Sequence, residues 1–429
     1  MEGKSVWMFR KIKSIIKNPY VFSIITKIFV VLIGFFFTVF QSRFLGPEIK
    51  GQVATLNSIT SISSIILALG IYQAYPYYKR TSEKDVLPIF LKIIIWMLIV
   101  YTCISVTIVI VFDLSVKYVV AFLVSPLLAF DSGISYITLV EVPNRKNACD
   151  MIVNVAELVL VIAMWFFAKP SFILGVLIIT IKDIVKAFIF AFWWRKSILL
   201  RSEPIIPWIS KLVKFGLFPM LSLLMTTLNY RVDVLMLDGR VADAAIGIYS
   251  VGVQLAERVW MLPDAMKGVL VSNLTKGKGE GEVSYVIRTC NTICLLLALA
   301  IIILGQPFIN IFFGKAYSEA YQITLVMLVG VFSMIYYKMI GSYNIAWGKQ
   351  RTNLIFLGIS VIANVLMNLI LIPVWGIYGA GIASVMSYTI CSTLFIIYFC
   401  YKTKQPFKGM IFMDRNDWSR LKVRLMHSK

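Results

Sequence analysis

Numerous ionisable residues lie inside long apolar stretches of the chain, where a charge is costly, and eleven of them are candidates for function. They are Lys27, Asp131, Glu157, Lys182, Asp183, Lys186, Arg231, Asp233, Glu257, Arg258 and Lys338. An ionisable side chain within a membrane usually faces the bundle interior, a partner charge or a water-filled cavity. These groups therefore predict a polar cavity. Its surplus of cations suits an anionic substrate, because arginine can grip a phosphate through two parallel hydrogen bonds.

Depth in the apolar stretches separates the candidate substrate-binding cations. Arg258 lies near the middle of the stretch 246–271, and Lys338 lies well inside 321–347. Lys27 lies roughly 9 Å into the first stretch, at 1.5 Å per residue, so it either binds substrate or snorkels to the headgroups. Arg231 lies near the end of its stretch, where a cation also anchors a helix. The predicted substrate-binding set is Arg258, Lys338, Lys27 and Arg231.

The acidic residues leave two roles open. Asp131, Glu157, Asp183, Asp233 and Glu257 either couple transport to H⁺ or Na⁺ or pair with nearby cations. Asp183 is three residues before Lys186, and this spacing favours a local ion pair on one helix. Glu257 and Arg258 are adjacent in the sequence, so their side chains point in different directions and do not neutralise each other directly.

The apolar stretches that must position these residues have the length of membrane spans, about 20 residues each. The chain has 429 residues, of which 59% are hydrophobic and 15% charged. The predicted spans are 21–40, 53–75, 88–112, 118–140, 149–168, 171–194, 213–236, 246–271, 284–313, 321–347, 353–374 and 377–401. The fold class is therefore an all-α polytopic membrane protein of about twelve transmembrane helices.

The net charge of +21 follows the topology and needs no nucleic acid to explain it. With the N-terminus inside, 27 Lys and Arg fall in cytoplasmic segments, and only Arg43, Lys50, Lys117, Lys169, Arg240 and Lys315 fall in outer loops. This asymmetry fixes the orientation, with both termini cytoplasmic. The predicted parts are a basic interfacial segment 1–20, a six-helix lobe 21–194, a cytoplasmic loop 195–212, a second six-helix lobe 213–401 and a basic cytoplasmic tail 402–429.

Several kinds of chemistry are disfavoured. The six cysteines are predicted to be buried small hydrophobic residues, not metal ligands or disulfides, and the single histidine, His427, lies in the tail. The glycine-rich stretch from Lys276 to Gly281 lacks the spacing of a phosphate-binding loop. No catalytic residue, metal or cofactor is predicted, and an ion gradient or the substrate gradient must drive any transport.

The two halves of the chain show weak similarity at a spacing near 200 residues. Short outer turns at 44–54 and 238–249 each end in a glycine that opens a span, and Asn154 has a counterpart in Asn364. Because six spans is an even number, the copies enter the membrane in the same orientation. Parallel repeats place substrate sites at the repeat interface. This pattern predicts two lobes around a central cavity.

Four stretches carry a family resemblance. They are Arg43-Phe44-Leu45-Gly46-Pro47-Glu48 with Gly51; Asn229-Tyr230-Arg231-Val232-Asp233 with Gly247-Ile248-Tyr249-Ser250 and Leu262-Pro263; Phe313-Gly314-Lys315-Ala316-Tyr317 with Ala320; and Asn364 through Asn368 with Pro373, Gly376, Gly379-Ala380 and Ala383-Ser384. In order and position the chain resembles the Wzx-type polysaccharide flippases of the multidrug/oligosaccharidyl-lipid/polysaccharide exporter superfamily.

The resemblance implies a substrate and a mechanism. The substrate would be undecaprenyl-pyrophosphate carrying one oligosaccharide repeat unit of an O-antigen, capsule or exopolysaccharide. Two lobes would open their cavity alternately to either side of a bacterial inner membrane. Lys27, Arg231, Arg258 and Lys338 match the family's cavity cations in type and rough position. Membrane lipids, and polymerase and chain-length machinery, would be partners.

Two other functions are weighed against this one. A multidrug or cation antiporter of the same superfamily should rely on an acidic and aromatic lining, which the surplus of Lys and Arg disfavours. A membrane polysaccharide polymerase usually has a large outer loop, and many acyltransferases use an intramembrane histidine. The predicted outer loops do not exceed about a dozen residues and the spans lack histidine, so a non-enzymatic transporter is favoured.

Overall fold

The protein is described by a computed structural model that covers residues 19–419, apart from 84, 201–203, 278 and 416, with side chains from Phe29 onward. Helices account for nearly all of the described chain, and no strand occurs in these ranges. The interfacial segment up to residue 18, the side chain of Lys27 and the end of the tail with His427 lie outside the described residues.

The helices, in chain order, have the following bounds. They are α2 Pro19–Ala68, η1 Ile71–Ala74, α3 Tyr75–Thr81, α4 Leu87–Val111, α5 Val116–Glu141, α6 Pro143–Phe167, α7 Phe172–Trp193, α8 Arg195–Leu199, α9 Ile206–Leu237, α10 Asp243–Glu257, η2 Arg258–Trp260, α11 Met261–Thr275, α12 Gly281–Phe312, η3 Lys315–Tyr317, α13 Ala320–Ala346, α14 Gln350–Thr403 and η4 Phe407–Met410. Helices α8 and α9 occupy much of the predicted loop 195–212.

Within the described residues, eight helices are long and apolar enough to cross a membrane. Two of them, α2 and α14, supply two spans each, because 54 residues in α14 would extend about 80 Å at 1.5 Å per residue, far beyond a bilayer core of roughly 30 Å. The turns occur at Gly46 (φ 69°) and Gly376 (φ 55°), left-handed conformations that favour glycine. Charged α7 and the broken helix α10–α11 complete the predicted twelve spans.

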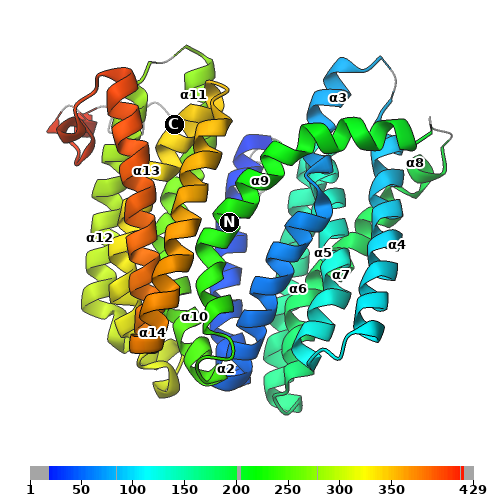
Figure 1. Cartoon of the computed structure of the whole chain (residues 1–429), viewed down its shortest axis with the longest axis horizontal. Coiled ribbons are helices and arrows are strands. Elements are labelled where there is room, and N and C mark those ends of the chain that lie inside the picture. Colours follow the sequence, from blue (N-terminus) through cyan, green and yellow to red (C-terminus); the bar gives the residue numbers. More distant parts are fainter. Residues whose placement is uncertain (1–18, 84, 201–203, 278, 416, 420–429) are drawn as a thin grey trace, which may run out of the picture. The chain divides into compact units, whose positions relative to one another are not determined.

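The chain forms two compact units. Unit 1 contains the residues up to Ile49 and Ile59–Met220, and unit 2 contains Lys50–Ser58 and Leu221–Lys429. In unit 1, α5 packs against α4, α6 and α7; in unit 2, α13 packs against α10, α11, α12 and α14 (Figure 1). The lobe boundaries predicted from the sequence stay a prediction.

Two of the sequence stretches that carried the resemblance meet inside unit 2. The amide of Asn364 donates to the Asn229 carbonyl oxygen at 3.3 Å and to Ser387 Oγ at 3.0 Å, and the amide of Asn229 donates to Ser360 Oγ at 2.9 Å. Asn229, Asn364 and Ser387 are fully buried. These motif residues therefore hold α9 against α14.

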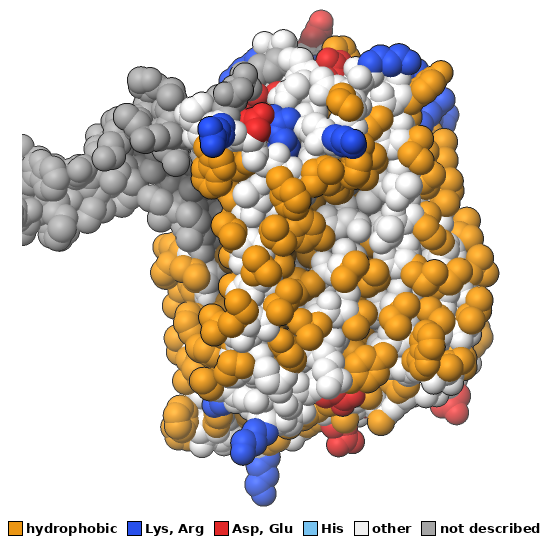
Figure 2. All heavy atoms as spheres, turned by 90° about the vertical axis from the view of Figure 1, so that its left-hand side faces the viewer, with side chains coloured by type: hydrophobic (Ala, Val, Ile, Leu, Met, Phe, Trp, Pro, Cys, Tyr) orange, Lys and Arg blue, Asp and Glu red, His pale blue; other side chains and the backbone are white. Residues whose placement is uncertain are grey.

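The outer face of unit 2 has the character expected of a membrane surface. Leu296 and Ile303 on α12 are 59% and 73% exposed. Figure 2 shows this apolar belt between two margins where charged side chains gather. Such a large exposed apolar surface is stable against lipid and not against water.

Candidate functional site

The break between α10 and α11 positions the cation that the sequence singled out. Helix α10 ends at Glu257, and a single 3₁₀ turn carries Arg258 before α11 begins at Met261. Pro263 accounts for the break, since its ring would clash with the carbonyl four residues earlier in a continuous helix. The break holds Arg258 half-buried within unit 2.

Arg258 forms no ion pair or hydrogen bond with any side chain in the described part of the chain. A second cation, Lys50, lies within electrostatic range of it and is only 4% exposed. The sequence placed Lys50 in an outer loop, but α2 continues through this position and carries it into unit 2. Arg258 and Lys50 therefore bring two positive charges close together within unit 2.

Lys338 is buried, and its positive charge is already paired with a carboxylate. Its ammonium lies 2.9 Å from Asp264 Oδ1, and its side chain is 4% exposed. The same ammonium lies 4.4 Å from the ring centre of Trp260 and 5.7 Å from that of Tyr230, within range of cation–π attraction. Asp264 also pairs with Lys267 at 2.8 Å. The sequence analysis did not single out Asp264 or Lys267, although both lie in the predicted span 246–271.

The remaining candidates of unit 2 are held by other protein groups. Arg231 lies 3.8 Å from Glu257, so the acid next to Arg258 in the sequence pairs with a different helix. Asp233 is fully buried and accepts hydrogen bonds from the Tyr249 hydroxyl and, at 3.1 Å, from Ser384. Asp233 therefore fastens α9 to α10 and α14.

In unit 1 the charged groups of α7 pair with the acids of neighbouring helices. Lys186 lies 2.8 Å from Asp183 and 3.2 Å from Asp131 on α5. Lys182 lies 3.4 Å from Glu157 on α6, and the Glu157 side chain is 2% exposed. The local pair expected from the sequence is present. Asp131 and Glu157 each lie within ion-pair distance of a lysine of α7, and their choice between pairing and ion coupling stays a prediction.

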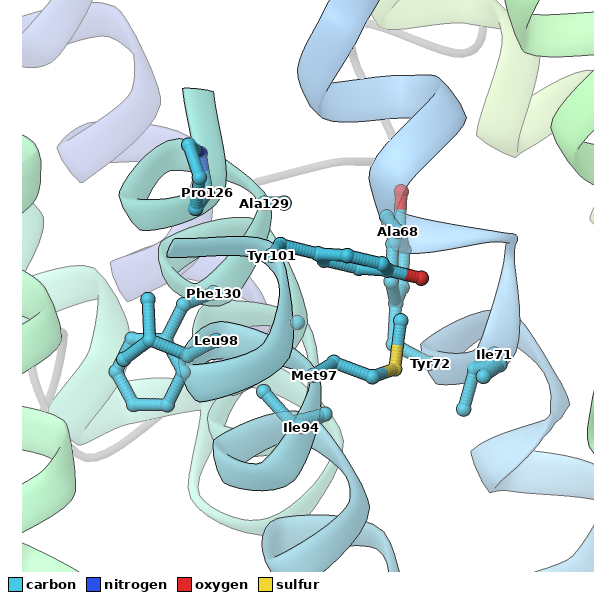
Figure 3. Close-up of a pocket in the computed structure, with 11 residues that line it drawn as sticks. Ala68, Ile71, Tyr72, Ile94, Met97, Leu98, Tyr101, Pro126, Ala129 and Phe130 are labelled. Atoms are coloured by element: carbon cyan, nitrogen blue, oxygen red, sulfur yellow. The ribbon is translucent and has the colours of Figure 1, made fainter. Parts of the chain in front are cut away.

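Unit 1 also contains an apolar pocket. It is lined by the end of α2, η1, α4 and α5, with Ala68, Met97 and Phe130 among its residues. Tyr72 and Tyr101 contribute the only hydroxyls of the lining, and no charged residue lines it (Figure 3). This pocket does not offer the groups that would bind a phosphate.

Comparison with known proteins identifies the family. The sequence profile described as "Polysaccharide biosynthesis protein" matches residues 41–322. The chain belongs to this family. The family resemblance inferred from the four motif stretches is thereby confirmed.

Solved structures with the same fold include a flippase and a multidrug transporter. The lipid II flippase MurJ, in its inward closed conformation, superposes with a TM-score of 0.70 and 14% identity, over 95% of this chain and 93% of that one. An inward-facing multidrug resistance MATE family transporter of the MOP superfamily gives 0.64 and 13%, over 87% and 94%. These likenesses confirm the fold.

One relative in sequence is described as a multidrug transporter. The probable multidrug resistance protein NorM of Bacillus anthracis is 26% identical over 192 residues, which are 40% of this chain and 41% of that relative. The match thus spans less than half of the length of either protein. This member of the polysaccharide biosynthesis family therefore shares sequence with multidrug transporters as well as their fold.

Proposed function

We propose that this protein is a flippase that carries undecaprenyl-pyrophosphate-linked oligosaccharide repeat units from the cytoplasmic to the outer leaflet by alternating access. Membership of the polysaccharide biosynthesis family supports the class of cargo. The observation that carries the proposal is Arg258, a half-buried guanidinium at a helix break that forms no ion pair within the described chain.

The chemistry of the cargo explains why such a cation is needed. A pyrophosphate entering a poorly solvated region loses hydration that the protein must replace. Arg258 can replace part of it with two parallel hydrogen bonds to phosphate oxygens, and Lys50 adds a second positive charge nearby. The oligosaccharide and its carrier cross without any covalent change, so the protein acts as a transporter and not as an enzyme.

The predicted cations have unequal parts in this proposal. Lys338 and Arg231 are each paired with an acid, so they set the field around the site and Arg258 makes the direct contact. The proposed location is the inner membrane of a bacterium with both termini cytoplasmic. H⁺ or Na⁺ is the proposed driving ion, and polymerase and chain-length machinery would receive the cargo.

The rival proposal is multidrug or cation export, which the NorM match favours. An organic cation would need an acidic or aromatic surface. Unit 2 has such an aromatic group in Tyr230, Trp260 and Tyr388. The ammonium of Lys338 already lies over the rings of Trp260 and Tyr230. Its positive charge repels a second cation from these rings. This arrangement favours the anionic cargo.

Lipid analysis of a deletion strain tests the proposal. Loss of a flippase leaves complete repeat units on the lipid carrier inside the cell, whereas loss of an enzyme that builds the unit leaves shorter ones. Re-expressed wild-type protein should clear the accumulated units, and Arg258→Ala at equal abundance should not. Normal lipids in the deletion strain, together with increased sensitivity to cationic drugs, would favour the rival.

A further inference from the structure

The described residues that follow α14 fold back onto α12. We call residues 405–419, apart from 416, the C-terminal strap. The guanidinium of Arg288 on α12 donates to both carboxylate oxygens of Asp417, at 2.5 and 2.8 Å, and to the Gly409 carbonyl oxygen at 2.5 Å. Asp417 is 1% exposed. This two-pronged pair fixes the far end of the strap to the helix.

Further hydrogen bonds hold the middle of the strap against α12, one helical turn after Arg288. The amide of Asn291 donates to the Ile411 carbonyl oxygen at 3.0 Å, and the Met413 backbone N–H donates to Thr292 Oγ1 at 3.1 Å. Met410 is fully buried within the core of unit 2. The strap is therefore an ordered part of unit 2, although the sequence suggested only a basic tail.

The position of the strap along α12 sets its depth in the membrane. The lipid-exposed leucines of α12 begin at Leu295 and Leu296. Thr292 is three residues earlier, about 5 Å along the axis at 1.5 Å per residue. The strap therefore lies where the apolar face of the helix begins, at the level of lipid headgroups.

The outward surface of the strap is aromatic and basic. Phe407, Phe412 and Trp418 are 43%, 49% and 51% exposed, and aromatic rings of this kind gather at membrane interfaces. Lys408 and Arg415 are exposed beside them. Figure 2 shows cationic side chains above the apolar belt, at the end of the molecule where Figure 1 places the strap.

The acids of the strap offset only part of this positive charge. The Asp417 N–H donates to Asp414 Oδ1 at 2.7 Å, and the Asp414 N–H donates to Asp417 Oδ2 at 3.2 Å. This reciprocal pair is a capping box that starts the short helix of the strap. Asp417 is also neutralised by Arg288. The exposed Lys408 and Arg415 outnumber the exposed Asp414, so the strap offers a net positive charge to the membrane.

We propose that the C-terminal strap binds the headgroups of anionic phospholipids through Lys408 and Arg415, with its exposed aromatic rings seated in the interface. The bound lipid would tie the end of α12 to the membrane surface. Each of the two cations is expected to raise the preference for anionic over zwitterionic lipid about fivefold. This inference does not depend on the proposed cargo.

Fluorescence quenching in lipid nanodiscs tests the proposal. Full-length protein is placed in discs of one fixed mixture of phosphatidylglycerol and phosphatidylcholine, with bromine atoms high on the acyl chains of one lipid or the other. The signal of Trp418 is the difference between wild type and Trp418→Phe. We expect brominated phosphatidylglycerol to quench Trp418 more than brominated phosphatidylcholine, and the excess to disappear in the double variant K408Q/R415Q.

A matched control separates the strap from general surface charge. Lys315 lies at the opposite end of α12, in η3, so Lys315→Gln removes a cation without touching the strap and should leave the excess unchanged. The proposal is overturned by equal quenching from both lipids in the wild type, by the absence of any signal from Trp418, or by an excess that survives in K408Q/R415Q.

Discussion

The intramembrane charges of the two units are arranged in opposite ways. In unit 1, Lys182 and Lys186 of α7 each lie within 3.4 Å of an acid on a neighbouring helix. In unit 2, Arg258 has no ion pair in the described chain, and Lys50 lies within electrostatic range of it. We therefore call the paired charges of α5, α6 and α7 in unit 1 a closed set, and Arg258 in unit 2 an open cation.

This difference separates structural charges from functional ones. In a closed pair, each charge replaces part of the hydration that the other loses on burial. Such a pair needs no ligand once the helices are packed. An open cation in the same kind of environment is left with a cost that only a ligand can offset. The substrate anion is thus expected to act on unit 2, and mutations in unit 1 should affect stability before they affect transport.

The largest effect on stability should come from Lys186→Met in unit 1. The substitution leaves Asp131 and Asp183 without their common cation, and breaking a buried pair in this way typically costs about 3–5 kcal/mol. We expect a marked fall in the midpoint of thermal unfolding in detergent. The double variant Lys186→Met with Asp131→Asn should recover much of it. A wild-type midpoint for the single variant would show that the pairs of unit 1 are not structural.

The next effect should appear in anion binding by unit 2. Arg258→Gln should weaken the affinity of purified protein for inorganic pyrophosphate by about 10- to 100-fold, the range for hydrogen bonds to a charged group. Isothermal calorimetry measures the change. Arg231→Gln is the matched control, because this arginine is already paired with Glu257, and it should lose less affinity. Equal losses would remove the distinction between open and paired cations within unit 2.

The fold could be predicted from the sequence because span length and charge bias are local properties of the chain. The twelve spans need only runs of about 20 apolar residues. The sequence also placed turns in the gaps 41–52 and 375–376, and the structure turns the chain within these gaps, at Gly46 and Gly376. At each turn, a single glycine with positive φ joins two predicted spans into one continuous helical segment.

The site was only partly predictable, because ion pairs between helices depend on packing. The pair of Asp183 with Lys186 follows from their spacing on one helix, but that of Lys186 with Asp131 joins residues 55 apart. Lys50 was assigned to a loop because it falls between the predicted spans 21–40 and 53–75, but α2 resumes after Gly46 and includes it. Asp264 becomes significant only beside Lys338, 74 residues away.

A smaller effect, of opposite sign, is expected from Asp264→Asn. This carboxylate neutralises Lys338 at 2.9 Å, so its removal should raise the positive field of unit 2. Two unit charges about 4 Å apart interact by about 1 kcal/mol even in water, which corresponds to roughly fivefold tighter pyrophosphate binding. The same calorimetric titration tests this sign. Weaker binding in Asp264→Asn would mean that Asp264 positions Lys338 for the anion and does not merely mask it.

The smallest effect on stability should come from Glu157→Gln. Its partner Lys182 is 31% exposed and lies 5.6 Å from the ring centre of Phe37, so the ammonium keeps water and an aromatic face when the acid is lost. Pairs of this kind contribute about 0–1 kcal/mol, and the unfolding midpoint should barely move. Transport then decides between the roles that the sequence left open. Normal polymer display in Glu157→Gln assigns the acid to pairing alone. Lost display at normal stability would make Glu157 an ion-coupling group, and unit 1 would no longer be a closed set.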